Sequence, residues 1–232
     1  HGVGPVQIDV PIENGMLAIG NDFTTAKLPK IKLIERFDSL SDEEEIKRKF
    51  EALANKKIMI IYGQDSFIPD ERKEKLEIIF KNYNCMISVD KLSNLHCEGT
   101  IDTAKAGLIA KYNGNFKELV PDIVITLAGN VAWDGKFSLK GLKNEFEHWI
   151  VNLDGKVQDY YKNLTTVFEM TTDEFINKMS KYKVSNKDEY YKLWEKKTAE
   201  FKFPEFEYSN LYATQKIMEN IPKNSILNLG NS

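Results

Sequence analysis

The sequence predicts an α/β fold in which a mainly parallel, Rossmann-like sheet carries helices on both faces, in three layers. Near-continuous apolar runs predict strands that are buried on both faces, as in parallel sheets; they lie at residues 57–63, 85–89 and 121–129. Amphipathic stretches alternate with these runs at the spacing of βαβ units; they lie at 41–54, 69–82 and 172–181. Two further strands are expected at 147–153 and 165–170.

Local signals place the helices within this pattern. Ser41 followed by Glu44 predicts a capping box at the start of the first helix. Thr172 is expected to cap the helix that it begins. The apolar residues expected on the inner faces of the three helices are Ile46, Phe50, Leu53, Leu76, Ile79, Phe80, Phe175 and Met179.

The remaining segments carry shorter or weaker patterns. Short strands are expected at 4–11, near Ile31–Ile34 and at 226–229. A long loop is expected at 90–100. Helices or helical turns are expected at 101–111, 116–120, 139–146, 186–201 and 207–220.

Composition excludes several classes of protein. The 232 residues carry a net charge of −3, which argues against a dedicated nucleic-acid binder. Two cysteines cannot form a disulfide scaffold or a four-thiolate zinc site, so reduced thiols and a cytoplasmic location are expected. The longest apolar run, Ile58 to Tyr62, is too short to span a membrane. Because the chain begins at His1 and stops after Ser232, we expect it to be part of a longer protein.

Ligands of an open parallel sheet bind beyond the carboxyl ends of its strands. The loops expected there contain Gly63, Gln64, Ser93, Gly129 and Asn130, which are the candidate lining of a nucleotide pocket for FAD or NAD. None of these loops has the Gly-x-Gly-x-x-Gly pattern, and a single glycine at a strand end more often serves a tight turn. The sequence alone fits both interpretations.

Other reactive or aromatic residues give no complete catalytic or metal-binding pattern. His96, Cys97 and Glu98 are adjacent in a loop, where neighbouring side chains point apart, so no metal site is expected. His148 is expected to be a packed or edge residue. The aromatic residues Tyr160, Tyr161, Tyr190, Tyr191 and Trp194 are expected to pack internally; an alternative makes the last three, with residues 201–206, an apolar docking surface.

Three segments resemble one branch of the thiamine-diphosphate-dependent enzymes, the 2-succinyl-5-enolpyruvyl-6-hydroxy-3-cyclohexene-1-carboxylate synthases of menaquinone biosynthesis. The first is Gly4-Pro5-Val6-Gln7-Ile8-Asp9-Val10-Pro11, similar to the last strand of an N-terminal pyrimidine-binding domain. The second pairs 121–129 with 147–155, similar to the family's middle domain. The third is 221–232, which resembles the entry into a diphosphate-binding domain.

The resemblance implies how the chain is divided. Residues 1–12 would end the pyrimidine-binding domain and 13–40 would form a linker. The Rossmann-like central domain would be 41–181, followed by a helical connector at 182–221 and the start of the diphosphate-binding domain at 222–232. The partners would be the other domains of the same chain, in a homodimer or homotetramer.

The resemblance also implies a function for the longer parent protein. Thiamine diphosphate and Mg²⁺ would be held by the other domains, with none bound to this chain and no catalytic residue within it. The parent would decarboxylate 2-oxoglutarate and add the succinyl unit to isochorismate. Asn231 and Ser232 would line its active site, and Lys140 matches the first residue of a Lys-Arg pair that faces the acceptor. Gly141 replaces the arginine, so a carboligase with another acceptor, or a nucleotide-binding module, is the alternative.

Overall fold

The computed structural model describes residues 33–102, 116–131, 139–140, 142, 145–185, 187–200, 202 and 205–227. Its strands are β1 (Glu35–Asp38), β2 (Ile58–Tyr62), β3 (Cys85–Val89), β4 (Thr100–Asp102), β5 (Ile123–Leu127), β6 (Glu147–Asn152) and β7 (Leu164–Glu169). Its helices are α1 (Glu43–Glu51), α2 (Asp70–Asn82), the 3₁₀ helix η1 (Phe116–Leu119), α5 (Thr172–Ser180), α6 (Glu189–Glu200) and α7 (Asn210–Glu219).

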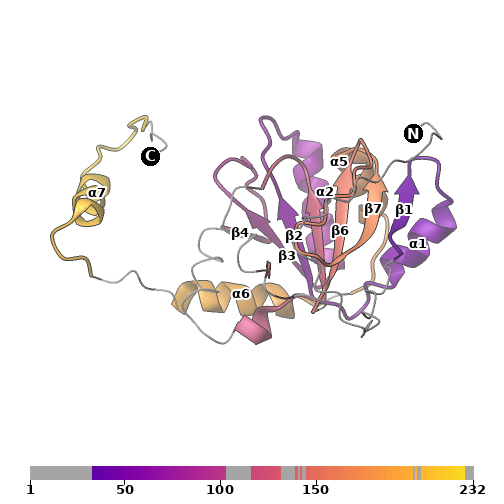
Figure 1. The fold of residues 1–232 in the computed structure, drawn as a ribbon. Helices are drawn as coiled ribbons and strands as arrows, with labels where there is room; N and C mark the ends of the chain where they lie inside the picture. The colour runs from indigo at the N-terminus through magenta and orange to yellow at the C-terminus, as the bar shows by residue number, and fades with distance from the viewer. Residues whose placement is uncertain are drawn as a thin grey trace, which may run out of the picture. The chain divides into compact units, whose positions relative to one another are not determined.

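The strands form one seven-stranded parallel sheet in the order β1-β7-β6-β5-β2-β3-β4 (Figure 1). The chain runs from β2 outward to β3 and β4, and then returns to β5 on the other side of β2. The topological switch point therefore lies between β2 and β5, where Ile58 pairs with Ile123 and Tyr62 with Leu127.

Alternate residues of the central strands supply the cores on the two faces of the sheet. Ile58, Ile60 and Tyr62 of β2 pack in the same core as residues of α1, α2 and α5. Met59 and Ile61 point to the opposite face, into a second core with residues of η1 and α6. Because successive side chains of a strand alternate between faces, an all-apolar strand needs a cover on each side. The three-layer fold expected from the sequence is confirmed.

Aromatic contacts join α1 to α5 and β7 in the first of these cores. The ring of Phe50 stacks on Phe168 at 6.0 Å between centroids and meets the edge of Phe175 at 5.6 Å. Phe168 and Phe175 also contact each other, at 4.9 Å. Such pairs contribute about 0.5–1.5 kcal/mol each beyond their burial. The inner faces expected for the three helices are confirmed, since all eight of their named apolar residues are buried.

Both predicted helix caps are displaced by one residue. Asp42, not Ser41, caps α1, because its carboxylate accepts from the amides of Glu44 and Glu45. The Ser41 hydroxyl instead contacts Asp38. In α5 the cap is Thr171 rather than Thr172, and its hydroxyl accepts from Glu174 N at 3.2 Å. Neighbouring polar residues can each supply a capping oxygen, so sequence alone did not decide between them.

The two edge strands differ from expectation. β4 lies where a loop and the start of a helix were predicted. β1 lies at Glu35–Asp38, just after the strand expected near Ile31–Ile34; residues 33–34 form no strand, and 31–32 lie outside the described residues. Strands of three or four residues are too short to show a period. Residues 226–227 form no strand. The segments expected at 4–11 and 103–111, and residues 141 and 143–144 of the helix expected at 139–146, lie outside the described residues, and the domain boundaries stay predictions.

Candidate functional site

The loops after β2 and β5 meet at the switch point and bond to each other through their backbones. Gly63 N donates to Leu127 O at 3.0 Å, and Gln64 N donates to Asn130 O at 2.8 Å. Gly129 N donates in turn to Gln64 O at 3.0 Å. Three amides at the place where a nucleotide phosphate would be expected are therefore bonded to the chain's own carbonyl groups.

This contact also explains why glycine stands at both positions. A Cβ atom on Gly63 would overlap the carbonyl oxygen of Gly129, and one on Gly129 would overlap the carbonyl oxygen of Gln64. Each glycine is needed for the close approach of two backbones. The geometry favours the structural interpretation of these glycines over the phosphate-binding one.

Ser93, the remaining residue expected in this pocket, closes a turn in the loop after β3. It is fully buried, and its hydroxyl donates to Asp90 O at 2.8 Å. The same loop reaches the switch point through Asp65 N, which donates to Leu92 O at 3.1 Å. The structure thus brings the loops of Gly63, Gly129 and Ser93 to one edge of the sheet. Their backbone amides and the Ser93 hydroxyl form hydrogen bonds to carbonyl groups of the chain itself.

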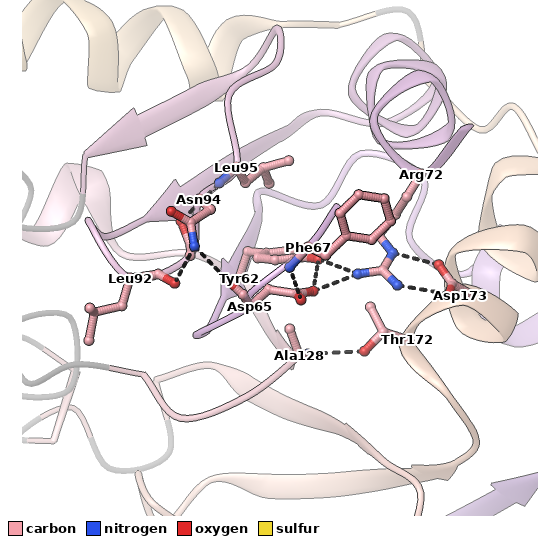
Figure 2. A network of polar contacts seen from close by, with 11 residues as sticks. Tyr62, Asp65, Phe67, Arg72, Leu92, Asn94, Leu95, Ala128, Thr172 and Asp173 are labelled. Atoms are coloured by element: carbon pink, nitrogen blue, oxygen red, sulfur yellow. Dashed lines mark hydrogen bonds and ion pairs between the residues drawn. The ribbon is translucent and has the colours of Figure 1, made fainter. Parts of the chain in front are cut away.

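A polar network that the sequence did not predict is centred on Arg72, in the first turn of α2 (Figure 2). Its Nη1 donates to Asp65 Oδ2 at 2.5 Å and to the Tyr62 hydroxyl at 2.8 Å. Its Nε and Nη2 donate to the two carboxylate oxygens of Asp173, at 2.5 and 2.8 Å. One guanidinium therefore joins β2, the loop after it, α2 and the start of α5. The scarcity of arginine, three in the chain, was the one signal that could have marked it.

Two groups of this network, Asp173 and Tyr62, have shifted pKa values. The hydrogen bond from Arg72 holds the pKa of Asp173 below its ordinary value. Burial is the main cause that raises the pKa of Tyr62 far above neutral pH, and the hydrogen bond to Asp65 is the second. The phenol therefore stays protonated and donates to Asp65. With the two carboxylates bound to one cation, the cluster offers structural bonds rather than a free base or nucleophile.

A hollow of about 300 Å³ opens beyond the carboxyl ends of β5 and β6. Its walls include Gly129, Asn130, Asn152, Asp154 and Tyr160. The side-chain nitrogen Nδ2 of Asn152 donates to Lys156 O at 2.9 Å. The side-chain oxygen Oδ1 accepts no hydrogen bond from any residue that the structure describes. The hollow is the size of a small-ligand pocket.

His148 lies buried within the sheet, as the sequence predicted. Its Nε2 lies 3.0 Å from Thr126 Oγ1, and its ring meets the edge of Tyr161 at 4.9 Å between centroids. Burial lowers its pKa to about 4, so the ring is neutral at physiological pH. Its Nδ1 has no partner among the described residues. The packed-residue interpretation of His148 is confirmed.

The other singled-out residues do not gather into a reactive cluster. His96 is exposed, while burial raises the pKa of the neighbouring Cys97 thiol to about 12, far from that of a reactive thiolate. Within the described ranges, no three His, Cys, Asp or Glu side chains come together to hold a metal ion. Lys140 is exposed, and Asn231 and Ser232 lie outside the described residues.

The internal packing expected for the aromatic residues of α6 is confirmed for Tyr190 and Trp194, and the alternative of a docking surface is wrong for these two, whereas Tyr191 is partly buried against the core. Tyr190 and Trp194 are each 1% exposed and pack against the sheet in the core shared with η1. The Tyr190 hydroxyl donates to Leu119 O at 2.8 Å. None of the helices in the described ranges combines the length and apolar composition needed to cross a membrane.

Comparison with known proteins gives the chain its relatives. It is 30% identical over 237 residues to the 2-succinyl-5-enolpyruvyl-6-hydroxy-3-cyclohexene-1-carboxylate synthase of Bacteroides thetaiotaomicron, and 31% identical over 238 residues to that of Phocaeicola vulgatus. The resemblance predicted from the sequence is confirmed. Each match takes in 100% of this chain but 41% of the relative, so the chain spans less than half the length of these synthases. No model of a protein family matches the chain.

The described residues do not fit a site for thiamine diphosphate and its metal. A magnesium ion on a diphosphate needs free carboxylate or carbonyl oxygens at octahedral spacing. The carboxylates at the switch point, Asp65 and Asp173, are bound to Arg72 instead. The backbone amides that could donate to phosphate oxygens, those of Gly63, Gln64 and Gly129, donate instead to carbonyl oxygens of the chain.

Proposed function

We propose that this chain is the non-catalytic central domain of a thiamine-diphosphate-dependent synthase. Its parent decarboxylates 2-oxoglutarate and adds the succinyl unit to isochorismate, in menaquinone biosynthesis. The observation that carries the proposal is the similarity of all of this chain to synthases of which it spans 41%. The polar groups at the switch point form hydrogen bonds to other groups of the chain, which favours a structural role over a catalytic one.

The proposal assigns the remaining expected residues to the parent's active site. Asn231 and Ser232 lie near the cofactor there, and Lys140 faces a carboxylate of the acceptor. Thiamine diphosphate and Mg²⁺ are held by the other domains of a cytoplasmic homodimer or homotetramer. When bound, the cofactor supplies the carbanion chemistry.

The 232-residue chain itself provides the first test. Circular dichroism and calorimetry are expected to show a cooperatively folded protein. Titration calorimetry with thiamine diphosphate and Mg²⁺ is expected to show no binding heat, and the chain is expected to release no carbon dioxide from 2-oxoglutarate. Tight cofactor binding or decarboxylation by this chain alone would refute the non-catalytic role.

The second test uses the full-length parent. With cofactor and Mg²⁺, it is expected to consume 2-oxoglutarate and isochorismate together, with one carbon dioxide released for each product formed. A second candidate is a carboligase with a different acceptor, favoured by Gly141 where the resemblance expects arginine. If the parent consumes 2-oxoglutarate with other ring or aldehyde acceptors but leaves isochorismate unchanged, the second candidate holds.

A further inference from the structure

Exposed apolar side chains of the sheet domain gather at one edge of the sheet. Between residues 33 and 200, the described large hydrophobic residues that are exposed number seven. Five of them follow the carboxyl ends of β1, β2, β3 and β6; they are Leu40, Phe67, Leu92, Leu153 and Val157. Because the strands are all parallel, these loops share the carboxyl edge. Of the other two, Leu33 precedes β1 and Ile78 lies on α2.

The opposite, amino edge is covered in the expected way for a protein surface. The described residues that lead directly into β2, β3, β5, β6 and β7 include no exposed large hydrophobic side chain; they are 52–57, 83–84, 120–122, 145–146 and 158–163. Their apolar side chains, such as Leu53, Tyr83 and Phe146, turn into the core. Scattered exposed apolar residues are ordinary, but their concentration at one edge is typical of a surface that another protein body covers.

Several charged side chains at the carboxyl edge are paired within the chain. Arg72 is bound to Asp65 and Asp173, Arg36 to Glu169 at 2.7 Å, and Lys156 to Asp154 at 2.6 Å. Unpaired charges are costly to bury and are depleted from interface centres. An edge with apolar side chains and paired charges suits a protein surface better than a free anionic ligand.

The loops that carry these side chains are also fixed in place. Phe67 follows Asp65, whose Oδ1 accepts from Phe67 N at 3.2 Å, and Leu92 O accepts from Asp65 N at 3.1 Å (Figure 2). Asn94 Nδ2 donates to Asp65 O at 2.6 Å and closes the same contact. A surface whose loops are already ordered loses little entropy when it is covered.

We propose that this carboxyl edge is the surface on which the rest of the parent chain packs. The inference rests on the proposed function, in which this chain is one domain of a larger synthase. Its relatives are longer than twice the matched region, since the match takes in 41% of each. That additional polypeptide is the occupant to which the proposal commits. Two members of this surface, Phe67 and Leu92, are 73% and 51% exposed and lie on linked loops.

Hydrogen–deuterium exchange, measured on the 232-residue chain and on the full-length parent, tests this assignment. Amides of 64–68, 91–95 and 153–158 are expected to exchange at least about tenfold more slowly in the parent. Amides of the amino-edge loop 52–57 are expected to exchange equally in both. Protection of the amino edge without the carboxyl edge, or of neither edge, would overturn the proposal. Protection that appears in the short chain as its concentration rises would assign the surface to a second copy instead, and also overturn it.

Substitution gives an independent readout. The double variant Phe67→Ser and Leu92→Ser is expected to leave the melting temperature of the 232-residue chain within a few degrees, because both side chains are exposed there. In the parent it is expected to lower the melting temperature and speed proteolysis, whereas Leu33→Ser, at a residue 92% exposed, changes neither. Equal behaviour of the two variants in the parent would refute the inference. An inactive parent with protected loops would instead count against the proposed reaction alone.

Discussion

Arg72 and Asp173 are paired by two hydrogen bonds across 101 positions of sequence. Nε reaches Oδ1 at 2.5 Å and Nη2 reaches Oδ2 at 2.8 Å. Such a two-pronged pair fixes orientation as well as distance. Since Arg72 also binds Asp65, the first turns of α2 and α5 are both attached to the loop after β2.

Removal of this guanidinium is expected to destabilise the domain. Arg72→Met leaves the Asp65 carboxylate, one-fifth exposed, without its cation, at an expected cost of about 2–3 kcal/mol in the free energy of unfolding. Urea unfolding followed by circular dichroism measures it. Arg48→Met is the matched control, because the Arg48 side chain donates to one exposed helix carbonyl. Equal losses in the two variants would contradict the role of the network.

The same pair predicts a loss of stability in acid. Arg72 holds the pKa of Asp173 in the folded protein below the ordinary value of 3.8. The stabilisation is therefore present above about pH 4 and is lost as the pH falls through the folded-state pKa. Asp173→Asn is expected to be less stable at pH 7 and to lose less stability between pH 5 and pH 2. Unfolding curves that keep the full acid dependence in this variant would show that other carboxylates produce it.

His148 predicts a second dependence on pH, in a higher range. Burial lowers its pKa from 6.5 to about 4, so the unfolded chain binds the proton more readily. The contribution of the neutral His148 ring to the free energy of unfolding is fully present above pH 6.5. It is lost as the pH falls toward 4, and the total loss is about 3 kcal/mol. His148→Gln is expected to flatten this slope in calorimetric scans. The control His96→Gln, at an exposed position, should keep it, and a slope unchanged in His148→Gln would count against the assignment.

The contact between Gly63 and Gly129 predicts the effect of adding a methyl group. Gly63→Ala would force apart the loops after β2 and β5, with an expected loss of about 1–3 kcal/mol. Ala128→Gly is the neighbouring control. Ala128 has a φ of 66°, a conformation that glycine adopts without strain. The melting temperature of the Ala128→Gly protein is therefore expected to change little. A Gly63→Ala protein as stable as the wild type would mean that the loops can separate freely.

Trp194 tests whether α6 is part of the domain. Trp194→Ala removes a side chain that is 1% exposed and is expected to lower the free energy of unfolding by about 3–5 kcal/mol. Tyr208→Ala removes an aromatic side chain that is 94% exposed, and a change within about 0.5 kcal/mol is expected. Thermal unfolding distinguishes the two. A small effect of Trp194→Ala would restore the docking interpretation of this helix.

The central strands and the inner faces of α1, α2 and α5 were predictable because each carries its own periodicity. β2 is apolar throughout, and the apolar residues within each helix recur at helical spacing, as Leu76, Ile79 and Phe80 do in α2, so local sequence is sufficient. The edge strands β1 and β4 were not predicted in place. Their three or four residues gain strand geometry from pairing with β7 and β3, and that pairing is not encoded locally.

The candidate site was less predictable than the fold. The sequence marked Gly63, Gln64, Gly129 and Asn130 as neighbours at one edge, and the structure brings them together. It did not reveal that their amides bond to each other's loops, since that depends on the spacing of β2 and β5. The network of Arg72 with Asp65 and Asp173 was likewise hidden, because its members come from separate elements.

By itself, the sequence determined the class of fold, the resemblance to the synthases and the faces that each long element buries. These properties follow from residue type at short separation, where periodicity and capping act. Only the tertiary structure decided that the switch-point loops bond to each other, that Tyr190 and Trp194 belong to the core, and that Phe67 and Leu92 remain exposed. Each of those outcomes depends on which residues distant in sequence meet in space, because burial and hydrogen bonding are settled by packing between elements.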